Sequence, residues 1–301
     1  MVFGVTILVY FLMSFSDVDP AYTALGDSAS AEAVAEYHEK YGLDDPWYVQ
    51  YVRYMVNLFQ GDMGTYGAAR NSVYKRISTA LPVTMQLTFI GLILATIVSF
   101  ALGVIAALYR DRWPDQLIRI FSIAGLATPS FWLAVLLILI FSSYLGWLPA
   151  SGSLPGFFED PAGYCARMAM PAISLAFPLI GQMTRIVRTA MVEELDKDYV
   201  RTARGAGLPE RVVIGKNVLR NALITPVTTL GMKIGYLMGG AVVIEVIFNL
   251  PGMGMAIQQG VQGNEPTLVQ GVVIVVAITF IIINIVVDML YLLINPRIRS
   301  V

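Results

Sequence analysis

The sequence has little charge, one cysteine and one histidine. Of its 301 residues 14% are charged and 56% are apolar, and 20 basic side chains nearly balance 21 acidic ones. This balance gives no support to nucleic-acid binding, which needs a basic surface. Cys165 alone excludes an internal disulfide, and His38, in a polar segment, gives little support to a metal site. An apolar excess of this size is typical of an integral membrane protein.

Apolar runs long enough to cross a bilayer core of about 30 Å occur along most of the chain. They lie at roughly residues 83–109, 117–145, 169–191, 222–249 and 268–294. The opening run, VFGVTILVYFLMSF, has 14 residues before Asp17 and is short for a span. We interpret residues 1–16 as an N-terminally truncated first transmembrane helix; the alternative is a signal peptide, although a basic n-region is missing. The sequence therefore predicts an all-α membrane protein with six transmembrane helices.

Basic residues are concentrated in three regions that alternate correctly to lie on one side of the membrane. These are Arg110 and Arg112; Arg185, Arg188, Lys197, Arg201, Arg204, Arg211, Lys216 and Arg220; and Arg297 and Arg299. Between them, residues 146–168 hold only Arg167, and residues 250–267 hold no basic residue. Since short basic loops stay in the cytoplasm, both termini are expected there.

Residues 17–80 form a long external segment with helical patterning. In SAEAVAEYHEKYG, apolar and acidic side chains fall on opposite helix faces and Gly42 ends the helix. We expect a small folded cap against the outer membrane face; a surface loop with helical fragments is the alternative.

Small residues recur every four positions in two of the spans. One ridge is Gly91, Ala95, Ser99, Gly103 and Ala107, and the other is Gly231, Gly235 and Gly239. Such ridges let helices approach closely, either within this chain or against a second membrane subunit.

A few residues inside the spans are candidates for a translocation path. Lys233, Glu245 and Asp288 are ionisable and should face a bundle interior or a watery path. We favour a structural role for them over a proton relay, which would make the protein an ion-coupled secondary transporter using Glu245 and Asp288. Pro129 is expected to kink or break the third span, either shaping the path or serving packing.

The densest charge cluster lies between two apolar spans, in DYVRTARGAGLPERVVIGKNVLRNALITPV, residues 198–227. Two short helical pieces are expected around Gly205–Gly207, with Pro209 starting the second. The first carries Val200 and Ala203 on one side, and the second groups apolar or small residues at helical spacing: Val212, Gly215 and Leu219. Such a helix pair lies on the membrane surface or docks into a groove of a partner.

This segment closely resembles the cytoplasmic coupling loop of ABC importer membrane subunits in the dipeptide/oligopeptide/nickel permease family. In that family the loop reads like DYxRTARAKGL…RNAL…P, and here Gly205 and Ala206 replace the usual alanine and lysine. Other stretches also resemble the family: LDDPWYVQYVRYM, GDMG, TPSFWLAVLLILIF, GWLPASG, MGGAVVIEVIFNLPGMG, VQGVVIVVAI and VDMLYLLINPRIR. The resemblance covers essentially the whole chain.

The resemblance implies a type I ABC importer permease fold in a prokaryotic cytoplasmic (inner) membrane. Residues 81–301 would form the permease core, including the coupling loop 193–220, and half of a translocation path for peptides. The implied partners are a second homologous permease, two cytoplasmic ABC ATPase subunits that bind ATP and Mg, an extracytoplasmic solute-binding protein and membrane lipid. The chain has no G-x-x-x-x-G-K-[ST] loop, so it is expected to be a transport subunit without enzymatic activity or a cofactor of its own.

The candidate site is the coupling loop. Gly207 is expected to take a positive φ at the sharp turn between its helices. The candidate ATPase contacts around it are Asp198, Arg201, Ala203, Arg204, Leu208, Glu210 and Arg211; for each charge taken alone, a solvated surface position is the alternative.

Overall fold

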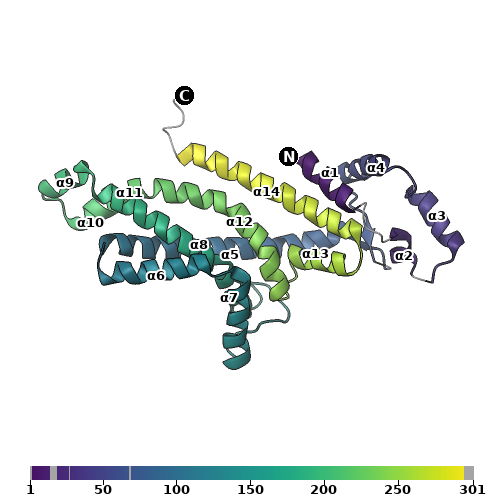
Figure 1. Ribbon diagram of the computed structural model, residues 1–301, viewed down its shortest axis with the longest axis horizontal. Coiled ribbons are helices and arrows are strands. Elements are labelled where there is room, and N and C mark those ends of the chain that lie inside the picture. Colours follow the sequence, from purple (N-terminus) through teal and green to yellow (C-terminus); the bar gives the residue numbers. More distant parts are fainter. Residues whose placement is uncertain (1, 14–18, 27, 68, 295–301) are drawn as a thin grey trace. The chain divides into compact units, whose positions relative to one another are not determined.

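The computed structural model describes residues 2–13, 19–26, 28–67 and 69–294, and nearly all of its regular structure is helical (Figure 1). The chain divides into two compact units. Unit 1 comprises residues 1–84 and 249–281, and unit 2 comprises residues 85–248 and 282–301, so α5 and α14 each contribute to both. Each unit is described by itself.

Four helices of the described chain are long and apolar enough to cross a membrane. They are α5 (Val73–Leu108), α8 (Pro161–Leu195), α12 (Ile224–Ile247) and α14 (Pro266–Ile294). A fifth span results if α6 (Trp113–Ala127) is counted together with α7 (Ser130–Leu137) and its π-helical continuation η1 (Ile138–Tyr144). The opening helix α1 (Val2–Met13) has 12 residues, so the count of six spans stays a prediction.

The third predicted span is broken at Pro129, as expected. α6 ends at Ala127, Pro129 is the N-cap of α7, and the two helical parts are bent by 101°. Because proline has no N–H and disfavours a helical residue before it, the helix cannot continue through Thr128.

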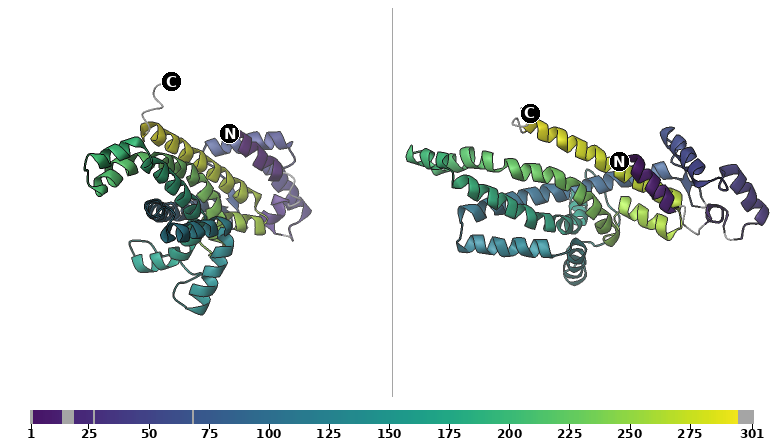
Figure 2. Two further views of the ribbon diagram at one scale, coloured as in Figure 1. Left: turned by 60° about the vertical axis from the view of Figure 1, so that its left-hand side comes forward. Right: turned by 45° about the horizontal axis from the view of Figure 1, so that its top comes forward.

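Unit 2 is built around α8, which packs against α5, α6, α7 and α12 (Figures 1 and 2). Leu175 of α8 fits between two glycines: a Cβ added at Gly91 of α5 would lie 3.2 Å from its Cδ2, and one at Gly240 of α12 would lie 3.0 Å from its Cδ1. A Cβ at Gly103 would lie 2.6 Å from Val187. The small-residue ridge of α5 therefore packs against a helix of its own chain.

The glycines of the second ridge differ in their surroundings: two are buried or packed against another helix, and the third is exposed. Gly231 lies against Val287 of α14, and Gly235 is buried. Gly239 is exposed, and a Cβ added there would meet no atom of the chain within 4 Å.

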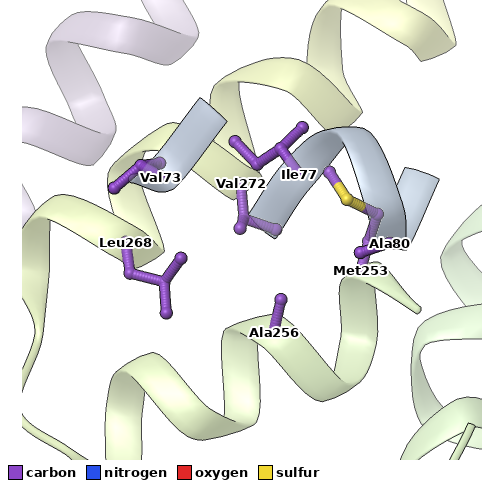
Figure 3. Packing of buried hydrophobic residues seen from close by; sticks show 7 residues of the cluster. All are labelled: Val73, Ile77, Ala80, Met253, Ala256, Leu268 and Val272. Atoms are coloured by element: carbon purple, nitrogen blue, oxygen red, sulfur yellow. The ribbon is translucent and has the colours of Figure 1, made fainter. Parts of the chain in front are cut away.

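Unit 1 has its own apolar core, in which three helical segments meet (Figure 3). α5 contributes its first turns, α13 (Met253–Gln262) its buried face, and α14 its start. The core residues are Val73, Ile77, Ala80, Met253, Ala256, Leu268 and Val272. This packing explains why α5 begins at Val73 rather than near residue 83: its first turns bury apolar side chains outside the predicted span.

A short antiparallel hairpin, β1 (Thr65–Tyr66) and β2 (Asn71–Ser72), precedes α5. The N–H of Gly67 in its turn donates to Glu265 Oε1 at 2.8 Å. Burial raises the pKa of the Glu265 carboxyl above its ordinary value.

The external segment contains α2 (Pro20–Leu25), α3 (Ala31–Tyr41) and α4 (Trp47–Phe59). α3 is capped by Ser30 and ends at Gly42 with φ 60°, which confirms the predicted amphipathic helix and its end. α4 packs on α1, where the Thr6 and Tyr51 hydroxyls lie 2.8 Å apart.

Candidate functional site

The charged segment 193–220, which we call the elbow, includes the last three residues of α8 and forms two helical arms, the second of which runs on to Ala222. The first arm is α9 (Asp198–Gly205), and the second is α10 (Glu210–Val212), the π-helix η2 (Val213–Val218) and α11 (Leu219–Ala222). Pro209 precedes the second arm as its N-cap.

The turn between the arms is a Schellman motif. Gly207 has φ 76°, its N–H donates to Arg204 O at 3.0 Å, and the Leu208 N–H donates to Ala203 O at 3.3 Å. The prediction that Gly207 takes a positive φ is confirmed. A side chain at Gly207 would meet no atom of this chain within 4 Å, so the backbone conformation alone explains the glycine within the chain.

The arms share an apolar core with α5 and α8. Its buried members are Ala107, Val187, Met191, Val200, Val213, Val218 and Ala222, and Ala203 packs at its edge. The α-helical spacing had grouped Val212 with Leu219, but Val212 is 37% exposed and Val213 is fully buried. The difference arises because η2 is a π-helix, whose five-residue hydrogen-bond spacing places Val213 and Val218 on one face.

Polar contacts fix the first arm at both ends. Glu194, buried at the end of α8, accepts from the Tyr199 hydroxyl at 2.7 Å and pairs with Lys197 Nζ at 2.8 Å. Burial raises the pKa of Tyr199 above its ordinary value. Across the turn, the Arg204 guanidinium donates to both Glu210 oxygens, at 2.6 and 3.2 Å.

The Arg204–Glu210 pair is bidentate and therefore geometrically specific. It raises the pKa of Arg204 and lowers that of Glu210. Of the remaining predicted contacts, Asp198 and Arg201 form a loose, exposed ion pair at 3.4 Å, Leu208 is 44% exposed, and Arg211 is exposed. The elbow thus braces itself internally and presents a leucine and several charges outward.

A cavity of about 450 Å³ lies where the elbow meets α5 and α8. Its walls combine an apolar floor with charged side chains: Leu108, Tyr109, Arg110, Val192, Leu195, Asp196, Arg204, Glu210 and Ile214. Arg110 Nη1 lies 2.8 Å from Asp196 Oδ2, so an ion pair joins the loop after α5 to the end of α8.

A second, buried ion pair joins α6 to α8 near the same end. Asp115 has no exposed surface, and its oxygens accept from Arg188 Nε and Nη2 at 2.6 Å each. Sequence reasoning counted Arg188 among the cytoplasmic charges and passed over Asp115. An acidic residue at the start of an apolar span was the available signal.

Arg167 is the largest fully buried side chain of the described residues, and sequence reasoning saw it only as a loop base. It donates to Ala150 O at 2.9 Å and to Phe248 O at the end of α12. A buried cation at a helix C-terminus is favoured by the exposed carbonyls there. Arg167 therefore fixes the loop before α8 to the end of α12.

Of the predicted ionisable intramembrane residues, Lys233 and Glu245 are not brought together. Lys233, in α12, lies 5.9 Å from the Tyr236 ring centre, and Glu245 is fully buried further along the same helix. Twelve residues of helix separate them by about 18 Å. The side chain of Asp288 lies outside the described residues. Within the described part of the chain, no group of three His, Cys, Asp or Glu side chains could hold a metal ion.

Comparison with known families decides the identity. Residues 99–300 match the family described as "Binding-protein-dependent transport system inner membrane component", and residues 1–88 match "Binding-prot-dependent transport system membrane comp, N-term". The chain belongs to this family.

Full-length relatives of this inner membrane component carry permease names. The "Probable D,D-dipeptide transport system permease protein DdpB" of Escherichia coli (strain K12) is 36% identical over 98% of this chain and 93% of its own length. A "Putative peptide transport system permease protein" of Brucella abortus (strain 2308) is 38% identical over 98% and 94%. The "Glutathione transport system permease protein GsiC" of Salmonella paratyphi A is 37% identical over 98% and 94%.

Solved structures show the same fold. An inward-facing form of the MetNI methionine ABC transporter matches with a TM-score of 0.59 and 17% identity, over 73% of this chain and 96% of the other. An amino acid ABC transporter crystallised with histidines matches with a TM-score of 0.52 and 15% identity, over 74% and 94%. The chain is thus an all-α, multi-pass permease subunit of the cytoplasmic membrane with the type I ABC importer fold. The comparisons give no support to the ion-coupled carrier.

Proposed function

We propose that this permease forms half of the translocation path of an ATP-driven importer for peptides. The relatives support this substrate class, because they are named for D,D-dipeptides, peptides and glutathione, all of which contain peptide-like bonds. In this proposal residues 17–80 form the external segment, and residues 81–301 form the permease core.

The elbow is the proposed contact with a cytoplasmic ABC ATPase. The observation that carries this proposal is a helix–turn–helix that follows α8. Its arms share an apolar core, and the Arg204–Glu210 ion pair joins them across the turn, while Leu208 in the turn stays exposed. A rigid elbow transmits displacement, whereas a flexible loop would absorb it. Closure of the ATPases would displace the turn at Gly207, and α8 would carry that movement to the helices packed against it.

The proposed complex contains a second homologous permease, two ATPases that bind ATP and Mg, and an extracytoplasmic solute-binding protein. Affinity purification from the native host in mild detergent, followed by mass spectrometry, tests this composition. We expect a second multi-span permease and one or two ATPases to co-elute. A stable, crosslinked assembly without an ATPase would contradict the proposal.

Gly207→Arg tests the elbow itself. We expect it to abolish ATP-driven uptake of radiolabelled alanyl-alanine while membrane insertion stays intact. The long cationic side chain would project from the turn that is proposed to contact the ATPase and would obstruct that contact. Gly205→Ala is the control, since Gly205 ends a helix, has open space around it and should retain uptake. Normal uptake by Gly207→Arg at normal expression would defeat the assignment.

A further inference from the structure

The buried Asp115–Arg188 pair is an unusual feature for an apolar span. Asp115 is fully buried, and the Arg188 side chain is 20% exposed. Three donors converge on the Asp115 carboxylate: Nε and Nη2 of Arg188 at 2.6 Å, and the Asp111 N–H at 3.0 Å. Asp111 itself takes a φ of 61°, which turns its N–H into this position. Two short parallel bonds make the pair directional as well as attractive.

A backbone contact joins the same two helices further along. A Cβ added at Gly181 of α8 would lie 2.6 Å from Ser122 O, and one at Gly125 of α6 would lie 3.1 Å from Phe177 O. Both glycines therefore allow backbone-to-backbone packing. Ten residues separate Asp115 from Gly125, so the two attachments lie about 15 Å apart along α6.

Two attachments at that separation hold α6 against both sliding and rotation relative to α8. α8 continues into the elbow at one end, and α6 ends at the 101° break before α7. The attached pair of helices therefore connects the elbow to the break.

We propose that Asp115 and Arg188 are positioning residues that make α6 and α8 move as one rigid body during transport. Displacement of the elbow then reaches α7 through the break at Thr128–Pro129 instead of being lost by slippage between helices. This inference rests on the proposed function of the elbow.

The functional test uses the complex purified from the native host and reconstituted into proteoliposomes. Arg188→Lys keeps the charge but loses the bidentate geometry, and Asp115→Asn removes the charge. We expect the number of ATP molecules hydrolysed per alanyl-alanine imported to rise about tenfold, within the usual range of coupling between sites.

Arg110→Ala is the matched control. It breaks the exposed Arg110–Asp196 pair, which joins the neighbouring loop to the same helix, and exposed pairs contribute little. The ratio of ATP hydrolysed to dipeptide imported should stay within about twofold of the wild type.

The double variant Asp115→Arg with Arg188→Asp exchanges the two charges. It should restore part of the coupling that the single variants lose.

A distance measurement on protein that keeps the Asp115–Arg188 pair covers the case in which the variants fail to assemble. In a Cys165→Ser background, spin labels at Ile120 of α6 and Glu193 of α8, both exposed, report the separation of the two helices. We expect this separation to be the same without nucleotide and with trapped ATP.

The outcomes are distinguishable. This inference alone is overturned by a changed α6–α8 separation, or by a normal ratio of ATP hydrolysed to dipeptide imported when the Arg188→Lys and Asp115→Asn complexes assemble. A purified complex that contains no ATPase overturns the proposed function, and this inference with it.

Discussion

At the scale of single residues, Gly205 and Gly207 have opposite backbone requirements although they lie two positions apart. Gly207 takes φ 76° after α9, whereas Gly205 is the last residue of that helix. A Cβ at either position would meet no atom of the chain within 4 Å. Any difference between the two alanine variants therefore reports backbone conformation.

We predict that Gly207→Ala destabilises the elbow by about 1 kcal/mol, because a left-handed conformation is costly for any residue with a Cβ. Gly205→Ala should stabilise it by roughly 0.5 kcal/mol, since alanine loses less entropy in a helix. Hydrogen exchange of the Ala206 and Leu208 amides in detergent-solubilised permease measures both effects. Equal exchange in the two variants would contradict the positive φ at Gly207.

At the scale of elements, the second arm of the elbow buries a face that only the π-helix explains. Val213 is fully buried, and the adjacent Val212 is 37% exposed. We predict that Val213→Ala costs about 2 kcal/mol of stability, because it removes two methyl groups from a packed core. Val212→Ala should change stability by less than about 0.5 kcal/mol. Thermal unfolding of the two variants in detergent compares their losses of stability. A larger loss for Val212→Ala than for Val213→Ala would support an α-helical register instead.

The external helices are joined by a histidine between two carboxylates. His38 Nδ1 lies 2.9 Å from Asp44, and Nε2 lies 2.9 Å from Asp19, the N-cap of α2. The hydrogen bond with Asp44 and then that with Asp19 raise the pKa of His38 above 6.5. Protonation therefore favours the folded arrangement of α2 and α3.

We predict that this stabilisation is fully present below about pH 6.5 and is lost as the pH rises through the raised pKa of His38. Hydrogen exchange of α2 and α3, corrected for the intrinsic pH dependence, should accelerate over that window. His38 is the only histidine of the chain, so His38→Gln is a clean control. A persistent transition in that variant would assign the effect to another group.

At the scale of the whole molecule, the source of energy separates an importer from an ion-coupled carrier. Uptake of radiolabelled alanyl-alanine can be followed directly in whole cells of the native host. We predict that uptake stops when ATP is depleted and persists when a protonophore collapses the gradient while ATP is maintained. The reverse pattern would return attention to Glu245 and Asp288.

Much of the architecture follows from local sequence. The apolar runs predicted the long helices because a bilayer core sets their length, Pro129 predicted the break because it lacks an N–H, and Gly42 and Gly207 marked positive-φ helix ends. The charge between two spans also located the elbow. Each of these signals concerns the chain segment in which it lies and needs no contact with distant residues.

Other features were decided only by tertiary packing. The Asp115 carboxylate meets an arginine 73 positions later, and Arg167 meets a carbonyl 81 positions away. The extension of α5 to Val73 depends on a core shared with α13 and α14, and the π-helical register of η2 depends on burial against α5 and α8. The sequence by itself determined the long apolar helices and the helix ends at Gly42, Ala127 and Gly207, because those features depend on local propensity and hydrophobicity. The tertiary structure decided which buried charges pair and which faces are covered, because those choices depend on groups that only folding brings together.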